Sequence, residues 1–96
     1  MITIEQLGAR RSELIALADR YKAENLRVFG SVARGEANEQ SDVDLLVHFR
    51  SGASLFDLID FKEDAEKLLG VSVDVVSDGG LSPYLKDRIL SEARPL

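Results

Sequence analysis

Residues 28–47 read VFGSVARGEANEQSDVDLLV, and this stretch decides the fold. One apolar run ends in a glycine-serine pair, Gly30-Ser31, and the next run begins with two aspartates one residue apart, Asp42 and Asp44. Aspartate is a poor strand former and is seldom fully buried without a partner, so the pair carries a local cost in folding. That cost indicates a chemical role for the two aspartates.

Two expected strands gather acidic side chains on one face. Because successive side chains of a strand point to opposite faces, Asp42 and Asp44 share a face of the strand expected over residues 42–49. The other face is apolar and consists of Val43, Leu45, Val47 and Phe49. In a later strand, over residues 71–76, Asp74 points away from a face of three valines. If these two strands are neighbours in similar register, three carboxylates converge on one patch.

Periodicity and capping signals predict seven alternating elements. They are a helix to about residue 23, a strand over residues 26–30, a short helix within residues 31–40, a strand over 42–49, a helix over 55–69, a strand over 71–76 and a helix over about 82–93. This order predicts an α/β (α+β) domain in which helices pack on one sheet of three or four strands.

Length and composition limit the class of protein. The chain has 96 residues, of which 45% are hydrophobic and 30% charged, which is typical of a single globular domain over residues 1–96. The net charge of -5 disfavours a direct nucleic-acid surface. The sequence contains no cysteine and no apolar run of membrane-spanning length. We therefore expect a cytoplasmic protein with no membrane association.

Three carboxylates on one patch repel one another, which raises their pKa values unless cations lie between them. Magnesium is a hard cation that prefers oxygen ligands and keeps coordination positions for water and substrate phosphate. Two such ions, roughly 3.5–4 Å apart, can assist an in-line displacement at phosphorus. We expect Asp42 and Asp44 to bridge two Mg²⁺ ions, and Asp74 to complete the first site and to assist deprotonation of the nucleophile.

Gly30 and Ser31 lie where a strand gives way to an expected helix start, and backbone N–H groups attract anions there. Glycine lets the main chain approach a phosphate closely, and the serine hydroxyl adds a hydrogen bond. We expect the pair to hold the β- or γ-phosphate of a nucleotide. Arg34, one turn further on, is either a further phosphate contact or a solvent-facing helix residue.

With these residues, the sequence resembles the DNA polymerase β-like nucleotidyltransferase superfamily, whose signature is an apolar residue, Gly-Ser, a spacer and Asp-apolar-Asp. Phe29-Gly30-Ser31 and Asp42-Val43-Asp44 fit this signature, and Asp74 matches the third family carboxylate. Residues 30–42 look in particular like the minimal nucleotidyltransferases, which are antitoxins paired with HEPN-domain ribonuclease toxins. The resemblance implies a small nucleotidyltransferase fold with a mixed sheet, and transfer of AMP from ATP to a tyrosine of the partner toxin, which silences it.

Plainer interpretations stay open beside this one. An isolated Asp-x-Asp pair is common on exposed strands, Gly-Ser is ordinary turn chemistry, and Asp74 alone fits an exposed strand residue. Two other functions also remain: an antitoxin that neutralises its partner by binding alone, and nucleotidyl transfer to a small molecule such as an aminoglycoside. The assembly that the resemblance implies is a hetero-oligomer of antitoxin and toxin.

Overall fold

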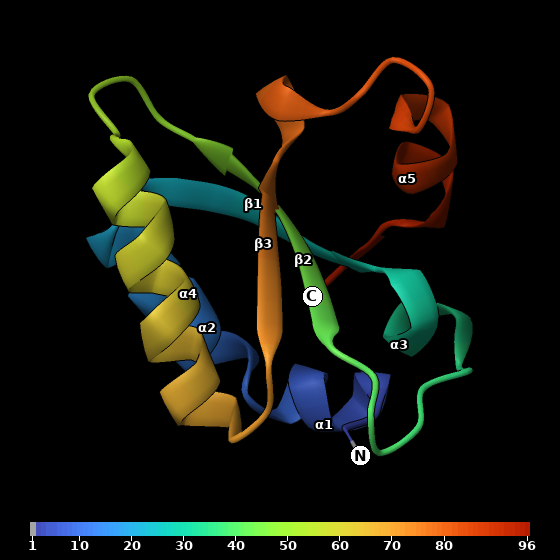
Figure 1. The fold of residues 1–96 in the computed structure, drawn as a ribbon. Coiled ribbons are helices and arrows are strands. Elements are labelled where there is room, and N and C mark those ends of the chain that lie inside the picture. Colours follow the sequence, from blue (N-terminus) through green and yellow to red (C-terminus); the bar gives the residue numbers. More distant parts are fainter. Residues whose placement is uncertain (1) are drawn as a thin grey trace.

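The computed structural model describes residues 2–96 and shows helices packed on a four-stranded mixed sheet (Figure 1). The strand order is β3-β2-β1-β4; β1 is antiparallel to β2 and β4, and β2 is parallel to β3. In chain order the elements are α1 (Ile4–Ala9), α2 (Arg11–Arg20), β1 (Ala23–Phe29), α3 (Gly30–Arg34), β2 (Val43–Phe49), α4 (Leu55–Leu69), β3 (Val73–Ser77), a 3₁₀ turn (Asp78–Gly80), α5 (Lys86–Glu92) and β4 (Arg94–Pro95). The predicted fold class is confirmed.

The ends of α4 follow directly from its local sequence. At its start, the Ser54 N–H donates to the Asp57 carboxylate at 2.9 Å, as a capping box requires. At its end, Gly70 adopts a left-handed φ of 71° and its N–H donates to the Glu66 carbonyl at 2.8 Å. The predicted range of this helix, residues 55–69, is confirmed at both ends.

The prediction of one unbroken first helix is wrong. The chain turns at Arg10, which separates α1 from α2, and α2 ends at Arg20. Gly8 precedes this break, and glycine is among the poorest helix formers because its backbone loses the most freedom on folding. The predicted capping box of Thr3 and Gln6 does form, with the Thr3 N–H donating to Gln6 Oε1 at 2.8 Å.

Three strand starts and one helix start also differ from the sequence prediction. The strand expected over residues 26–30 begins at Ala23, because a bulge between Glu24 and Arg27 interrupts the alternation that marks a strand. The strand expected over residues 42–49 begins one residue later, at Val43, and the one expected over residues 71–76 covers Val73–Ser77. The last helix begins at Lys86, since residues 83–85 form a turn.

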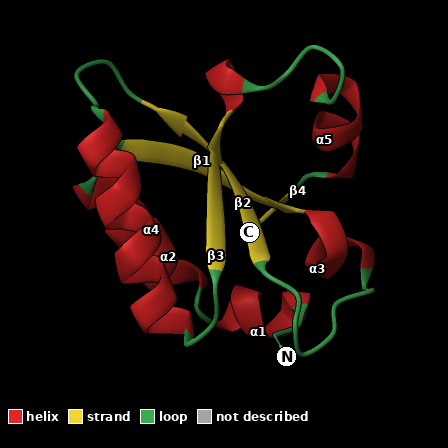
Figure 2. Ribbon diagram, viewed as in Figure 1, coloured by secondary structure: helices red, strands yellow, loops and turns green. Residues whose placement is uncertain are grey.

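The hydrophobic core lies between the sheet and the helices α1, α2 and α4. Figure 2 shows α2 and α4 side by side, with α3 and α5 at the other end of the sheet. The predicted apolar face of β2 is confirmed, because Val43, Leu45 and Val47 are fully buried in this core. The neighbouring residue Asp44 is turned to the opposite face and stays half-exposed. Within residues 2–96, no helix is long and apolar enough to cross a membrane.

Candidate active site

Asp44 and Asp74 are direct neighbours in the sheet. The parallel ladder of β2 and β3 pairs their Cα positions, and paired residues point to the same face. The antiparallel ladder of β1 and β2 pairs Asp44 with Phe29 on its other side. Asp44 is therefore central, with Asp74 on one side and the end of β1 on the other.

The charge state of Asp44 reflects these neighbours. Partial burial, followed by the negative charges of Asp74 and Asp42, raises the pKa of Asp44 to about 6, against a smaller opposing effect of Arg34. A carboxylate with a raised pKa beside two further acids gains from a cation. For Asp44, the raised pKa agrees with the mutual repulsion of carboxylates that the sequence predicts.

Asp42 lies at the margin of this group. It precedes β2, is exposed, and adds to the negative potential at Asp44. Asp74 is likewise exposed. Within residues 2–96, no three acidic or histidine side chains lie close enough together to hold a metal ion by themselves. The donor set still fits Mg²⁺, which is commonly held by one or two carboxylates and completed by substrate phosphate and water.

Gly30 and Ser31 lie at the junction of β1 and α3, next to Asp44. Gly30 adopts a left-handed φ of 74°, and a Cβ built on it would overlap with Oδ2 of Asp44 and come 3.1 Å from its Cγ. Only glycine fits there, so the backbone and the Asp44 carboxylate are in contact. The Gly30 turn and the Asp44 carboxylate thus occupy one place in the fold.

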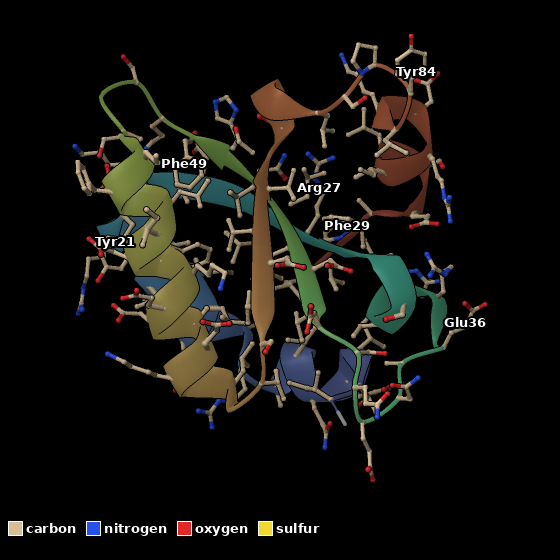
Figure 3. All side chains as sticks on the ribbon, viewed as in Figure 1. Tyr21, Arg27, Phe29, Glu36, Phe49 and Tyr84 are labelled. Atoms are coloured by element: carbon tan, nitrogen blue, oxygen red, sulfur yellow. The ribbon has the colours of Figure 1, made fainter. Side chains whose placement is uncertain are left out.

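Arg34, at the end of α3, is held by two carboxylates. Its Nε donates to Glu36 and its Nη1 donates to Glu92, each at 3.0 Å. These hydrogen bonds, with that of Glu36 the larger, raise the pKa of the Arg34 guanidinium. Figure 3 shows Glu36 close to the end of α3. Arg34 is thus exposed at the end of α3, as a solvent-facing helix residue would be, and its guanidinium is paired with two carboxylates, so the structure leaves both interpretations open.

Two residues on this side of the sheet escaped the sequence analysis. Glu92, the last residue of α5, accepts hydrogen bonds from Arg34 and from the Gly30 N–H. Arg27 lies along β1 near Phe29 (Figure 3), and within the described chain its buried Nε lacks a hydrogen-bond partner. No sequence signal marks Glu92, because it meets the site only through tertiary packing 62 residues away from Gly30.

The mixed sheet, the glycine-serine turn and the adjacent acids define an enzyme of the class that transfers nucleotidyl groups. Residues 14–96 match the family model described as "Nucleotidyltransferase domain". The chain therefore belongs to this family, and the membership predicted from Gly30-Ser31 and Asp42-Val43-Asp44 is confirmed.

Curated relatives carry the name that the resemblance implied. The chain is 40% identical to "Protein adenylyltransferase MntA" of Thermococcus cleftensis over 96 residues, covering 96% of this chain and 94% of the relative. It is 42% identical over 83 residues to "Putative protein adenylyltransferase MJ0435" of Methanocaldococcus jannaschii, covering 86% of this chain and 89% of the relative.

Solved structures agree with the fold. A structure described as "Structure of putative minimal nucleotidyltransferase" superposes with a TM-score of 0.88 at 52% identity, over 99% of this chain and 97% of that one. More distant matches include a "toxin-antitoxin with AMP-PNP", with a TM-score of 0.75 at 20% identity, covering 88% of this chain and 69% of that one. A tri-AMPylated Shewanella oneidensis HEPN toxin in complex with MNT antitoxin gives a TM-score of 0.69 at 17% identity, with coverages of 92% and 69%.

Proposed function

We propose that this protein is an antitoxin that transfers AMP from ATP to a hydroxyl group, a tyrosine of a HEPN-type toxin, and thereby neutralises the toxin. Relatives named protein adenylyltransferases support the reaction. Structures of the same fold described as a toxin-antitoxin with AMP-PNP and as a tri-AMPylated HEPN toxin with its antitoxin support the donor and the partner. The observation that carries the proposal is the contact between the Gly30 backbone and the Asp44 carboxylate.

In this proposal Asp42, Asp44 and Asp74 hold Mg²⁺, as two ions. When bound, Mg²⁺ neutralises phosphate charge and favours the ionised form of the attacking hydroxyl. Gly30 and Ser31 bind the β- or γ-phosphate through a backbone N–H and a hydroxyl.

The transfer needs one bond made and one broken. The acceptor oxygen bonds to the α-phosphorus, the bond from that phosphorus to the bridging oxygen breaks, and pyrophosphate leaves. Asp74 is the most exposed of the paired strand acids, so its carboxylate can orient the hydroxyl and accept its proton. Arg34 adds a positive charge beside the phosphates, which offsets the negative charge of the nearby aspartates.

We further propose that residues 1–96 form one nucleotidyltransferase domain, which acts in the cytoplasm as a hetero-oligomer with its toxin. The net charge of -5 gives no basis for direct nucleic-acid binding.

The decisive experiment incubates the chain with ATP, Mg²⁺ and the protein encoded by the neighbouring gene, and follows the intact mass of that partner. We expect discrete mass additions of AMP with the wild-type chain and none with Asp44→Asn. Asp78→Asn is the matched control, because Asp78 follows β3 and pairs with His48 at 3.1 Å, away from Asp44. AMP transfer that persists in Asp44→Asn contradicts the assigned site.

The same preparations separate the two rival functions. An antitoxin that acts by binding alone would neutralise the toxin equally well as Asp44→Asn, with no change in the partner's mass. An enzyme for small molecules such as aminoglycosides would consume ATP with that acceptor and leave the protein partner unmodified.

A further inference from the structure

A carboxylate of this chain already occupies the place proposed for nucleotide phosphate. Oε2 of Glu92 accepts a hydrogen bond from the Gly30 N–H at 3.3 Å, and Oε1 accepts one from Arg34 Nη1 at 3.0 Å. These two donors, one backbone and one guanidinium, belong with the Ser31 hydroxyl to the group that we propose binds phosphate. Burial alone would raise the pKa of Glu92, but the bonds from Arg34 and Gly30 lower it overall, so the side chain is an anion at neutral pH.

The surroundings hold Glu92 in this position. Arg88, one turn earlier in α5, lies 3.5 Å from Oε1 of Glu92. Only 19% of the Glu92 side chain is exposed, compared with 66% for Glu36, the other partner of Arg34. The geometry therefore distinguishes the two acids, since Glu92 alone bridges Gly30 and Arg34.

We propose that Glu92 is an autoinhibitory occupant of the phosphate site, and that a polyphosphate must displace it before it can bind. The inference deepens the proposed function and rests on it for the identity of the ligand as a nucleoside triphosphate. The Gly30 N–H is a single donor, and a second anion beside the Glu92 carboxylate would meet like-charge repulsion. Carboxylate and phosphate thus compete for the same hydrogen bonds.

The segment that carries Glu92 is suited to moving. The seven-residue helix α5 contains no buried residue, and it continues into β4, which is only two residues long. Elements with few buried contacts open locally at low cost in free energy. Displacement of Glu92 would accordingly loosen α5 and leave the core between the sheet and α4 intact.

Binding of inorganic tripolyphosphate in magnesium buffer tests the competition without requiring transfer of AMP. We expect Glu92→Gln to bind tripolyphosphate about fivefold more tightly than the wild type, the factor typical of one partly exposed ion pair. Glu36→Gln is the matched control: it removes a carboxylate from the same guanidinium but none from Gly30, so we expect less than a twofold gain.

The rate of amide hydrogen exchange gives a second test, because a purely electrostatic effect of Glu92 would not change this rate. Tripolyphosphate should accelerate amide exchange in residues 86–95 of the wild type and leave the rate in Glu92→Gln unchanged. The inference is overturned if Glu92→Gln binds no more tightly than the wild type, if wild-type α5 exchange does not respond, or if neither chain binds tripolyphosphate.

AMP transfer, measured on the same proteins, keeps this inference separate from the proposed function. If no AMP is transferred but Glu92→Gln still binds tripolyphosphate more tightly than the wild type, only the proposed function is contradicted. If AMP is transferred normally but the wild type and Glu92→Gln bind tripolyphosphate equally well, only the autoinhibitory role of Glu92 is contradicted.

Discussion

The Gly30 backbone lies against the carboxylate of Asp44, so that a Cβ at position 30 would overlap with Oδ2 of Asp44 unless that carboxylate moved. The backbone there also has a φ of 74°, which side chains with a Cβ adopt only at a cost. The turn that is proposed to receive phosphate is thus fitted to the acid that is proposed to hold the metal. A substitution at Gly30 should therefore affect Asp44, and a substitution at Asp44 should change the cost of a side chain at position 30.

We therefore predict that Gly30→Ala destabilises the fold more than Gly35→Ala does. Gly35 has nearly the same φ, 73°, but no atom lies within 4 Å of a Cβ built there, so its substitution costs only the strain of about 1–2 kcal/mol. Gly30→Ala adds the overlap with Asp44 to the same strain. Urea denaturation of both variants measures the difference in the free energy of unfolding.

A double variant isolates the overlap at position 30. Asp44→Ala removes Oδ2 and Cγ and leaves only the Asp44 Cβ, at 3.4 Å from the built Cβ. In that background, Gly30→Ala should cost no more than Gly35→Ala. An unchanged cost would show that the Asp44 carboxylate is not what excludes a side chain from position 30.

A second prediction concerns the divalent cation. Mg²⁺ together with AMP-PNP should raise the melting temperature of the wild type, because a ligand at about 100 times its Kd stabilises the folded state by about 2.7 kcal/mol. Asp44→Asn and Asp74→Asn should lose most of this shift, since each removes a carboxylate from the paired positions of β2 and β3. Asp78→Asn should keep it. Equal shifts in all four proteins, or removal of Mg²⁺ without effect on the wild type, would contradict the assigned ligands.

The face on which Asp44 and Asp74 lie was predictable because it depends on local alternation, which places both acids opposite the buried valines. That β2 and β3 are parallel neighbours in register was only a condition of the prediction, because strand pairing is a contact between distant parts of the chain. The same rules give the ends of α4, where Ser54, Asp57 and Gly70 act within a few residues of one another.

The parts that escaped prediction depend on distant contacts or on irregular backbone. The bulge before Arg27 hides the first residues of β1, and Asn25 within it has a φ of 54°. Strand β4 is two residues long and exists only through pairing with β1. The contact of Glu92 with Gly30 follows from how α5 packs against α3, which a local pattern does not encode.

A third prediction follows from Glu66, which fastens α4 to the start of β3. Its carboxylate accepts the Val73 N–H at 3.0 Å and pairs with Lys62 at 3.2 Å, and these contacts, the backbone bond first, lower the pKa of Glu66. Because the pKa of Glu66 is lower in the folded state than in the unfolded state, its ionised form stabilises the fold. This stabilisation is fully present at pH values above the unfolded-state pKa of glutamate, about 4.3, and is lost as the pH falls through the folded-state pKa.

The free energy of unfolding of Glu66→Gln should accordingly lie below that of the wild type at pH 7, and the two should converge in acid. Glu63→Gln serves as the control, because Glu63 is exposed on the same helix. Urea denaturation between pH 3 and pH 7, about the range that the ordinary pKa of glutamate sets, measures the three curves. A difference between Glu66→Gln and wild type that stays constant over this range would refute the ionic contribution.

The last prediction compares two phenylalanines of α4 that differ in burial. Phe61 is fully buried in the core, whereas 76% of Phe56 is exposed. Phe61→Ala should cost about 3–5 kcal/mol, because it leaves a cavity between α4 and the sheet in addition to the lost transfer energy. Small domains have a total stability of about 5–15 kcal/mol, so the melting temperature of this variant should lie far below that of the wild type.

The matched control is Phe56→Ala, whose free energy of unfolding should stay within about 0.5 kcal/mol of the wild type. Thermal and urea unfolding of the isolated chain distinguish the two, and comparable losses in both variants would mean that Phe56 is covered in solution.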